Sequence, residues 1–460
     1  MKTNKKAFIA HIRAREDKMI RFGFSKTDIT PRVGVELSGF GPYWHRQSIA
    51  VRDRLSAKAM ALTNGKRTVV LLSLDLLLIS REITDKTRKL VADKYSEPCD
   101  VIIHCTHTHS GPAVYGIEGW GEIDVPYCEL LPNRLAEACL EAIQNMKEAT
   151  VSHAEVPCVG IGFNREYDKV EQPIETVIRD DWRPAKPELT ETTCHVLKFE
   201  SDGKMIGFIS HFGCHPVVCC RQTRYIHGDY CGVATNILES ENPGAVGLFL
   251  QGALGDVDSC FVHKPEKESL EALDVIAARY VKAVREGLKQ AKPVTIDKIS
   301  SAASRVNFSR KNLDVETLKK LLAEKENLFA QKGASDEDRN VRMSGVYVTN
   351  LRKLIARMEK DGFKNDTAEL NALHMGPIAI LTTPFEVFQA IKNDVRKQSK
   401  FKNTWVLSVT NECKGYAPDD TTAKRGGYAA EQVPMMIGEP PYADIHGELV
   451  KALIELEKKL

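Results

Sequence analysis

The chain has no long apolar run and almost no excess of charge. None of its apolar stretches approaches the roughly 18 residues that a membrane-spanning helix needs, so we expect no stable membrane insertion. The 64 basic and 62 acidic side chains leave a net charge of +2, which gives no reason to expect nucleic acid as a partner. A hydrophobic content of 43% over 460 residues is normal for a globular protein with a sizeable core.

Several common sequence motifs are also missing. The absence of GxGxxG, GK[ST] and GxSxG strings excludes the usual nucleotide sites and a serine α/β-hydrolase. The twelve cysteines show neither CxxC spacing nor a disulfide framework, so we expect free, reduced thiols. Residues 1–20 are basic, but the apolar run at 7–10 is too short for a signal peptide. We therefore predict a cytoplasmic protein with a basic N-terminal extension.

Strand-like and helical patterns alternate through residues 21–460, which predicts a single domain. The strand-like runs are almost continuously apolar, as in strands covered on both faces. They lie at 68–74, 101–103, 205–210, 245–250, 378–381 and 405–409. Amphipathic helical patterns lie at 127–146, 268–290, after Pro384 and at 446–459. The expected fold is α/β, with mixed β-sheets covered by helices.

The segment 308–365 has a different composition from its surroundings. It is charged and poor in strand formers, with two helical patterns on either side of residues 332–336. We interpret it as a helical hairpin inserted between strands, with its charges on a solvated face. Elsewhere, unusual polar residues collect after the predicted strands, where ligand sites of open α/β sheets form.

The most informative stretch is HCTHTHSGP, which spans His104–Pro112. It follows the apolar run at 101–103, and strand alternation places His107 and His109 on the same face. Two imidazoles side by side at a strand end suit a divalent metal such as zinc. Taken alone, the segment also fits two half-buried histidines bonded to the backbone.

Three other segments carry candidate residues. His215 stands before a proline, which favours an extended backbone, and it suits either a third nitrogen ligand or a packed core position. Glu386 lies at a strand-to-helix junction, where a first-turn glutamate is also favoured by the helix dipole. Asp256 and Asp258 follow a glycine-punctuated turn, for which turn formation is the simpler explanation.

Taken in order, these segments resemble the catalytic domain of the neutral, non-lysosomal ceramidases. The resemblance covers most of the chain, and its most specific string is THTHSGP at 106–112. Shorter matching segments lie at 23–31, 37–41, 54–59, 73–75, 163–165, 214–216, 252–257 and 384–386. The resemblance implies the ceramidase catalytic fold and a hydrolase.

The family binds one catalytic zinc ion through two histidines, a glutamate and a tyrosine. Carried over by motif, the resemblance implies the ligands His107, His215, Glu386 and Tyr416. Tyr416 is placed by the match of residues 411–416 to the family's N-x-x-x-x-Y. A tyrosine ligand binds as phenolate, so the metal must lower its pKa well below about 10.

The resemblance also implies residues around the metal, and here the chain departs from the family. Tyr428 matches the second family tyrosine, Arg165 matches the arginine at the substrate carbonyl, and His109 falls beside the metal. The catalytic serine of the family directly follows the glycine-aspartate-valine loop, but here Asp258 takes that place and Ser259 comes one residue later. A shift of one residue in an extended loop turns the hydroxyl to the other face.

We therefore expect a zinc-dependent hydrolase with one Zn²⁺ per chain that cleaves an amide (N-acyl) bond by metal-activated water. Asp258 or His109 takes the proton, while Arg165 and Tyr428 stabilise the oxyanion. Two alternatives stay open: a zinc-dependent esterase or carbohydrate-active hydrolase with Asp258 as acid/base, and a non-catalytic metal-binding relative.

The family's C-terminal β-sandwich domain and secretion signal have no counterpart in the sequence. We therefore expect a divergent, catalytic-domain-only member whose small-molecule substrate is more soluble than ceramide. A homo-oligomer is compatible with the sequence.

Overall fold

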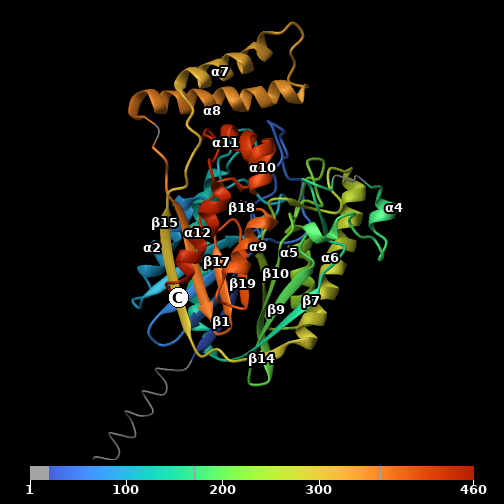
Figure 1. Ribbon diagram of the computed structural model, residues 1–460. Coiled ribbons are helices and arrows are strands. Elements are labelled where there is room, and N and C mark those ends of the chain that lie inside the picture. Colours follow the sequence, from blue (N-terminus) through green and yellow to red (C-terminus); the bar gives the residue numbers. More distant parts are fainter. Residues whose placement is uncertain (1–19, 169–171, 363) are drawn as a thin grey trace, which may run out of the picture.

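The computed structural model describes residues 20–168, 172–362 and 364–460 (Figure 1). The predicted basic extension lies, apart from its last residue, outside the described residues. Three main β-sheets form the centre of the fold. The first contains β1 (Arg21–Asp28), β3 (Ser56–Thr63), β4 (Thr68–Leu74), β5 (Cys99–Cys105) and β6 (Lys147–Glu148), in the order β5-β4-β3-β1-β6.

The other two sheets are built from later parts of the chain. The second contains β7 (Thr150–Pro157), β9 (Thr193–Ser201), β10 (Lys204–Phe212), β12 (Val246–Gln251) and β14 (Lys292–Val294), in the order β12-β10-β9-β7-β14. The third contains β15 (Ile299–Val306), β16 (Ala368–Met375), β17 (Ile378–Thr382) and β19 (Asn403–Leu407), in that order. Three two-stranded pairs join β2 (Ala50–Val51) to β11 (Tyr225–Ile226), β8 (Gly162–Asn164) to β13 (Val257–Ser259), and β18 (Glu386–Val387) to β20 (Tyr416–Ala417).

Apolar side chains from all three sheets meet in one central core. Its buried members include Phe22 and Leu71 from the first sheet, Phe199 and Leu250 from the second, and Trp405 from the third. Strands β3 and β4 are buried along their whole length, as expected where both faces of a sheet are covered.

A pair of helices covers the outer face of each sheet. They are α2 (Arg81–Ala92) and α3 (Val125–Gln144) on the first, α5 (Asp229–Glu241) and α6 (Glu266–Gln290) on the second, and α9 (Gln389–Gln398) and α12 (Ile445–Glu457) on the third. Each pair buries an apolar face against its sheet in a separate cluster. The remaining short turns are α4 (Ile174–Val177), η1 (Pro187–Leu189), α10 (Asp420–Arg425), η2 (Tyr428–Gln432) and α11 (Val433–Met436). The predicted α/β class is confirmed.

The predicted helical hairpin is present as α7 (Val315–Ala330) and α8 (Arg339–Asp361). It connects β15 to β16, which are antiparallel neighbours in the third sheet. In Figure 1 the two helices lie side by side beyond the rest of the molecule, above α11. One side of the hairpin is solvated, but α8 also contacts α11, so the insertion reaches the sheet edge where the candidate site lies.

Each main sheet contains one parallel pair at or near its edge. These pairs are β4 with β5, β10 with β12, and β17 with β19. No helix in the described ranges is long and apolar enough to cross a membrane. The twelve cysteines, which all lie in those ranges, form no disulfide. The cytoplasmic location stays a prediction.

Candidate metal centre and active site

The candidate site lies beyond the carboxyl ends of the three parallel strand pairs. His107 follows β5, and His215 follows β10. Glu386 and Tyr416 begin β18 and β20, which follow β17 and β19 and pair with each other in parallel with these two residues in register. The four ligands implied by the family resemblance therefore come from three sheets to one place. The strand ends thus meet as expected, and a ligand site at this place stays a prediction.

The route by which the histidines of the HCTHTHSGP stretch meet differs from the sequence prediction. Strand β5 ends at Cys105, and His107 has a left-handed backbone with a φ of 72°. The prediction that strand alternation places His107 and His109 on one face is therefore wrong. The rings of His107 and His109 nevertheless lie 5.1 Å apart, centroid to centroid. His104 stays in the core, where Ser408 O and Gln251 N bond its two ring nitrogens.

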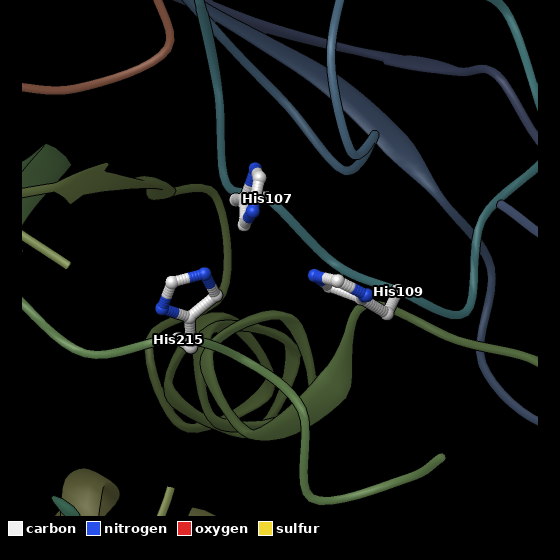
Figure 2. A group of neighbouring side chains, drawn as sticks. All are labelled: His107, His109 and His215. Atoms are coloured by element: carbon white, nitrogen blue, oxygen red, sulfur yellow. The ribbon is translucent and has the colours of Figure 1, made fainter. Parts of the chain in front are cut away.

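Three imidazoles are oriented toward a common point. The rings of His107, His109 and His215 face one another in Figure 2, and ring nitrogens of all three lie within 4.8 Å of each other. Each Nδ1 is bonded to a backbone carbonyl and therefore carries a proton, which favours the tautomer whose neutral ring has its lone pair on Nε2. The acceptors are Leu77 O at 2.9 Å, Gly39 O at 3.1 Å and Leu254 O at 2.6 Å, respectively.

The Glu386 carboxylate completes this group of donors. Its Oε2 lies 3.0 Å from His215 Nε2 and 3.5 Å from His107 Nε2. Burial alone would raise the pKa of the Glu386 carboxyl, but the two histidines hold that pKa well below its ordinary value. Burial, with Arg165 nearby, lowers the pKa of His215. At neutral pH the site thus offers a carboxylate and a neutral imidazole, the forms that bind metal.

Tyr416 lies beside these donors as a neutral phenol. Its ring stacks 6.4 Å from that of His215, and the Arg165 guanidinium lies 5.3 Å from its centroid. Burial raises the pKa of Tyr416 well above its ordinary value, and the Glu386 carboxylate raises it further. Ionisation of this phenol therefore requires an additional positive charge at the site.

Asp258 and Ser259 point to opposite faces of the short strand β13. Asp258 pairs in register with Phe163 of β8, and its Oδ1 accepts a bond of 3.1 Å from Arg165 Nη1. The Ser259 side chain is fully buried, and its Oγ donates to His215 O at 2.5 Å. Asp258 therefore faces the site with Arg165, while the serine hydroxyl supports the backbone of a candidate ligand.

This geometry predicts that Ser259 is not a nucleophile. Substituting Ser259→Ala should leave kcat within a few fold of the wild type, because its hydroxyl faces the protein interior. The free energy of unfolding should fall by about 1–3 kcal/mol, since His215 O loses a buried donor. Steady-state kinetics and thermal unfolding measure the two effects. A kcat reduced a thousandfold in a protein of normal stability would contradict this assignment.

Two adjoining cavities open on this group of residues. The larger has a volume of about 490 Å³ and is lined by His109, Arg165, His215 and Asp258 among others. The smaller, of about 70 Å³, touches His107 and Glu386 but is otherwise mostly apolar. Its other lining residues are Gly39, Leu77, Leu78, His109, Ile117, Trp120, Tyr416, Tyr428, Val433, Met436 and Ile437.

Tyr428 stands at the boundary of both cavities. Its side chain is 41% exposed, and its ring lies 5.9 Å from that of Tyr416. It begins the π-helical turn η2, directly after Gly426 and Gly427, which both have positive φ angles. The phenol is thus available to a molecule bound in either cavity.

Two glycines allow the loops of the site to approach one another. A Cβ on Gly39, whose φ is 97°, would stand 2.2 Å from His109 Nδ1. A Cβ on Gly255 would stand 2.5 Å from Glu386 O. Larger residues at these positions would displace His109 or Glu386, so the glycine-rich segments serve the site by close packing.

Some residues of the site carry no signal that sequence reasoning could use. Arg46 is fully buried and donates to His109 O at 2.9 Å, which fixes that loop. Trp120 lines both cavities, and its position between two glycines does not predict this role. Arg339 and Met343 line the larger cavity from α8, although the charges of this segment were interpreted as a solvated face.

The match to a known family agrees with this geometry. A sequence profile described as "Neutral/alkaline non-lysosomal ceramidase, N-terminal" matches residues 20–259, just over half of the chain. The chain belongs to this family. The resemblance predicted from the sequence is therefore confirmed. Ceramidase membership implies a hydrolase with a small-molecule substrate, and neutral ceramidases are metal-dependent, in keeping with the cluster of three histidines.

Solved ceramidase structures share the fold. The neutral ceramidase from Pseudomonas aeruginosa superposes with a TM-score of 0.73 at 17% identity, covering 96% of this chain and 75% of that one. A structure described as a ceramidase complexed with C2 gives a TM-score of 0.73 at 16% identity, covering 95% of this chain and 75% of that one. At such identities the likeness establishes the fold alone.

Proposed function

We propose that this ceramidase-family protein is a zinc-dependent amidohydrolase that cleaves the N-acyl bond of a soluble small molecule. The observation that carries the proposal is the shared orientation of His107, His109 and His215. Each Nδ1 is held by a carbonyl, and ring nitrogens of all three lie within 4.8 Å of one another beside a buried carboxylate. Backbone carbonyls commonly orient metal-binding histidines in this way.

The residues fit one divalent ion held by His107, His215, Glu386 and Tyr416. Imidazole, carboxylate and phenol donors form the N/O set that suits zinc in hydrolytic sites. The buried Nε2 of His109 has no hydrogen-bond partner among the described residues, so this nitrogen also lacks a structural explanation. Such an ion would supply Lewis acidity, polarising the scissile carbonyl and lowering the pKa of a water molecule.

The remaining side chains divide the other tasks between them. His109 is neutral, because burial and then His107 and His215 lower its pKa well below the ordinary value. Its unpartnered Nε2 suits it to accept a proton from water and return it to the leaving amine. Arg165, which Asp258 orients, and Tyr428 line the larger cavity and act as donors for the oxyanion. Asp258 is the alternative proton acceptor.

Metal analysis and a substrate panel test this proposal. The protein purified without chelators should contain one zinc ion per chain and hydrolyse at least one short N-acyl compound. A chelator should abolish turnover, and stoichiometric Zn²⁺ should restore it. The panel should include matched esters, because preferential ester cleavage would favour the esterase alternative. A protein that retains no metal after gentle purification, or turnover that resists chelation, would refute the proposal.

A further inference from the structure

The lining of the larger cavity contains more arginines than carboxylates. Three arginines line it, against two carboxylates, Glu166 and Asp258. Both carboxylates are already paired: Asp258 with Arg165 at 3.1 Å, and Glu166 with Arg425. The other two arginines, Arg221 and Arg339, are exposed and have no carboxylate partner among the described residues. The lining thus contains two guanidiniums that form no ion pair among the described residues.

Local structure does not account for these two arginines. Arg339 is the first residue of α8, where the helix dipole disfavours a cation. Asp336, Glu337 and the N-cap residue Asp338 directly precede it, but none of them forms an ion pair with its guanidinium among the described residues. Arg221 lies 5.4 Å from the centre of the Trp44 ring, and this contact leaves all its hydrogen-bond donors available. Both guanidiniums line the same cavity as the proposed catalytic residues and come from separate parts of the chain.

The two cavities divide a substrate into unequal halves. The smaller cavity, of about 70 Å³, is less than half the size of the roughly 150 Å³ cavity that accommodates benzene, so it holds a short acyl group and no long chain. Apart from the donors of the site, its walls are apolar side chains such as Leu77, Ile117 and Met436, which suit an acyl group, whereas a polar amine half would lose hydration there. The amine half therefore belongs in the larger, polar cavity.

Resting on the proposed function, we infer that the substrate is a short-chain N-acyl compound whose amine half carries an anionic group, held by Arg221 and Arg339. Carboxylates and phosphates share the chemistry that two guanidiniums recognise, since both accept bidentate, charge-assisted hydrogen bonds. The inserted hairpin then has a role in specificity, because α8 supplies Arg339 to the cavity wall.

Matched substrate pairs test the inference. N-acetyl amino acids are compared with their carboxamides, and O-phosphorylated N-acetylethanolamine with N-acetylethanolamine. The metal-loaded wild type should have a kcat/KM at least about tenfold higher for one anionic member than for its neutral partner, and the preferred pair identifies carboxylate or phosphate. Arg221→Ala and Arg339→Ala should each raise KM for the anionic substrate about tenfold and change the neutral one less than about threefold.

Arg352→Ala provides the matched control, because Arg352 is an exposed arginine on α8 that does not line the cavity. It should change neither substrate. Calorimetric titration of the same compounds separates the two proposals. Arginine-dependent binding of the anion without hydrolysis would refute the amidohydrolase function but support the anion site. Equal turnover of charged and neutral amides, unaffected by either arginine substitution, would refute the anion site alone.

Discussion

His215→Ala should lose the bound metal and more than about a thousandfold in kcat. His215 Nε2 lies 3.0 Å from Glu386 Oε2 and its Nδ1 is fixed by Leu254 O, so the substitution removes an oriented donor from the proposed ligand set. A bound metal supplies several kcal/mol of transition-state stabilisation, and about 4 kcal/mol corresponds to a thousandfold in rate. Metal analysis and kinetics on the same preparation measure both losses.

His109→Ala is the matched comparison for this substitution. If His109 acts on protons beside the metal, the variant should retain one zinc ion per chain while kcat falls about 10²- to 10⁴-fold. Loss of zinc from both variants would instead make His109 a ligand, which the cluster of three imidazoles also allows. Retention of zinc and full activity by His215→Ala would contradict the metal centre. Circular dichroism shows whether each variant is folded.

Asp258→Asn should lower kcat about a hundredfold with little effect on KM. The asparagine keeps the shape of the side chain and a hydrogen bond to Arg165. It removes the negative charge that orients this guanidinium, and it also removes the alternative proton acceptor. Asp258→Ser restores the residue type that the family has at this position. A gain of ceramide hydrolysis by this variant would show that Asp258 prevents the family's ceramidase activity in the wild type.

Asp256→Asn is a control for Asp258→Asn, because it changes the same residue type two positions earlier and tests an effect on folding rather than on catalysis. The Asp256 carboxylate is buried and accepts bonds from Gln389 N and Asn164 Nδ2, which anchor α9 and β8 rather than the cavity. We expect this variant to unfold at lower temperature with kcat near that of the wild type. Full turnover by both Asp258 variants would mean that Asp258 has only a structural role in β13.

Strands with continuous apolar sequence could be predicted well. The runs at 68–74 and 378–381 match β4 and β17 within one residue. Helices α3 and α6 start and end within two residues of the predicted ranges. Burial on both sides of a strand leaves a strong signal in the sequence, because polar residues are excluded from both faces.

Other elements could not be read from the same patterns. Helices α2 and α5 were missed. Only four residues of α2 are buried, whereas α5 is buried on most sides and small residues such as Gly232 and Ala234 blur its period. The left-handed backbone at His107 also has no sequence signal, since it depends on Leu76 and Leu77 in the neighbouring loop.

The candidate site was predicted mainly through the family resemblance. Residue patterns alone pointed to His107 and His109, but left Glu386 a helix-start residue and His215 a core residue. Their convergence depends on packing between three sheets, which no local pattern records. The contribution of α8 to the cavity wall was missed for the same reason. In the sequence Arg339 resembles any exposed charge, and only the contact between α8 and α11 in the fold shows that it lines the cavity.

The most direct test is a crystal structure of the protein grown with zinc, with anomalous data collected on both sides of the zinc edge. The proposal predicts a single strong peak about 2.0–2.3 Å from the Nε2 atoms of His107 and His215 and from oxygens of Glu386 and Tyr416. The absence of a peak at these residues, or a peak only at the separate cluster of His153, Glu155 and His195, would contradict it.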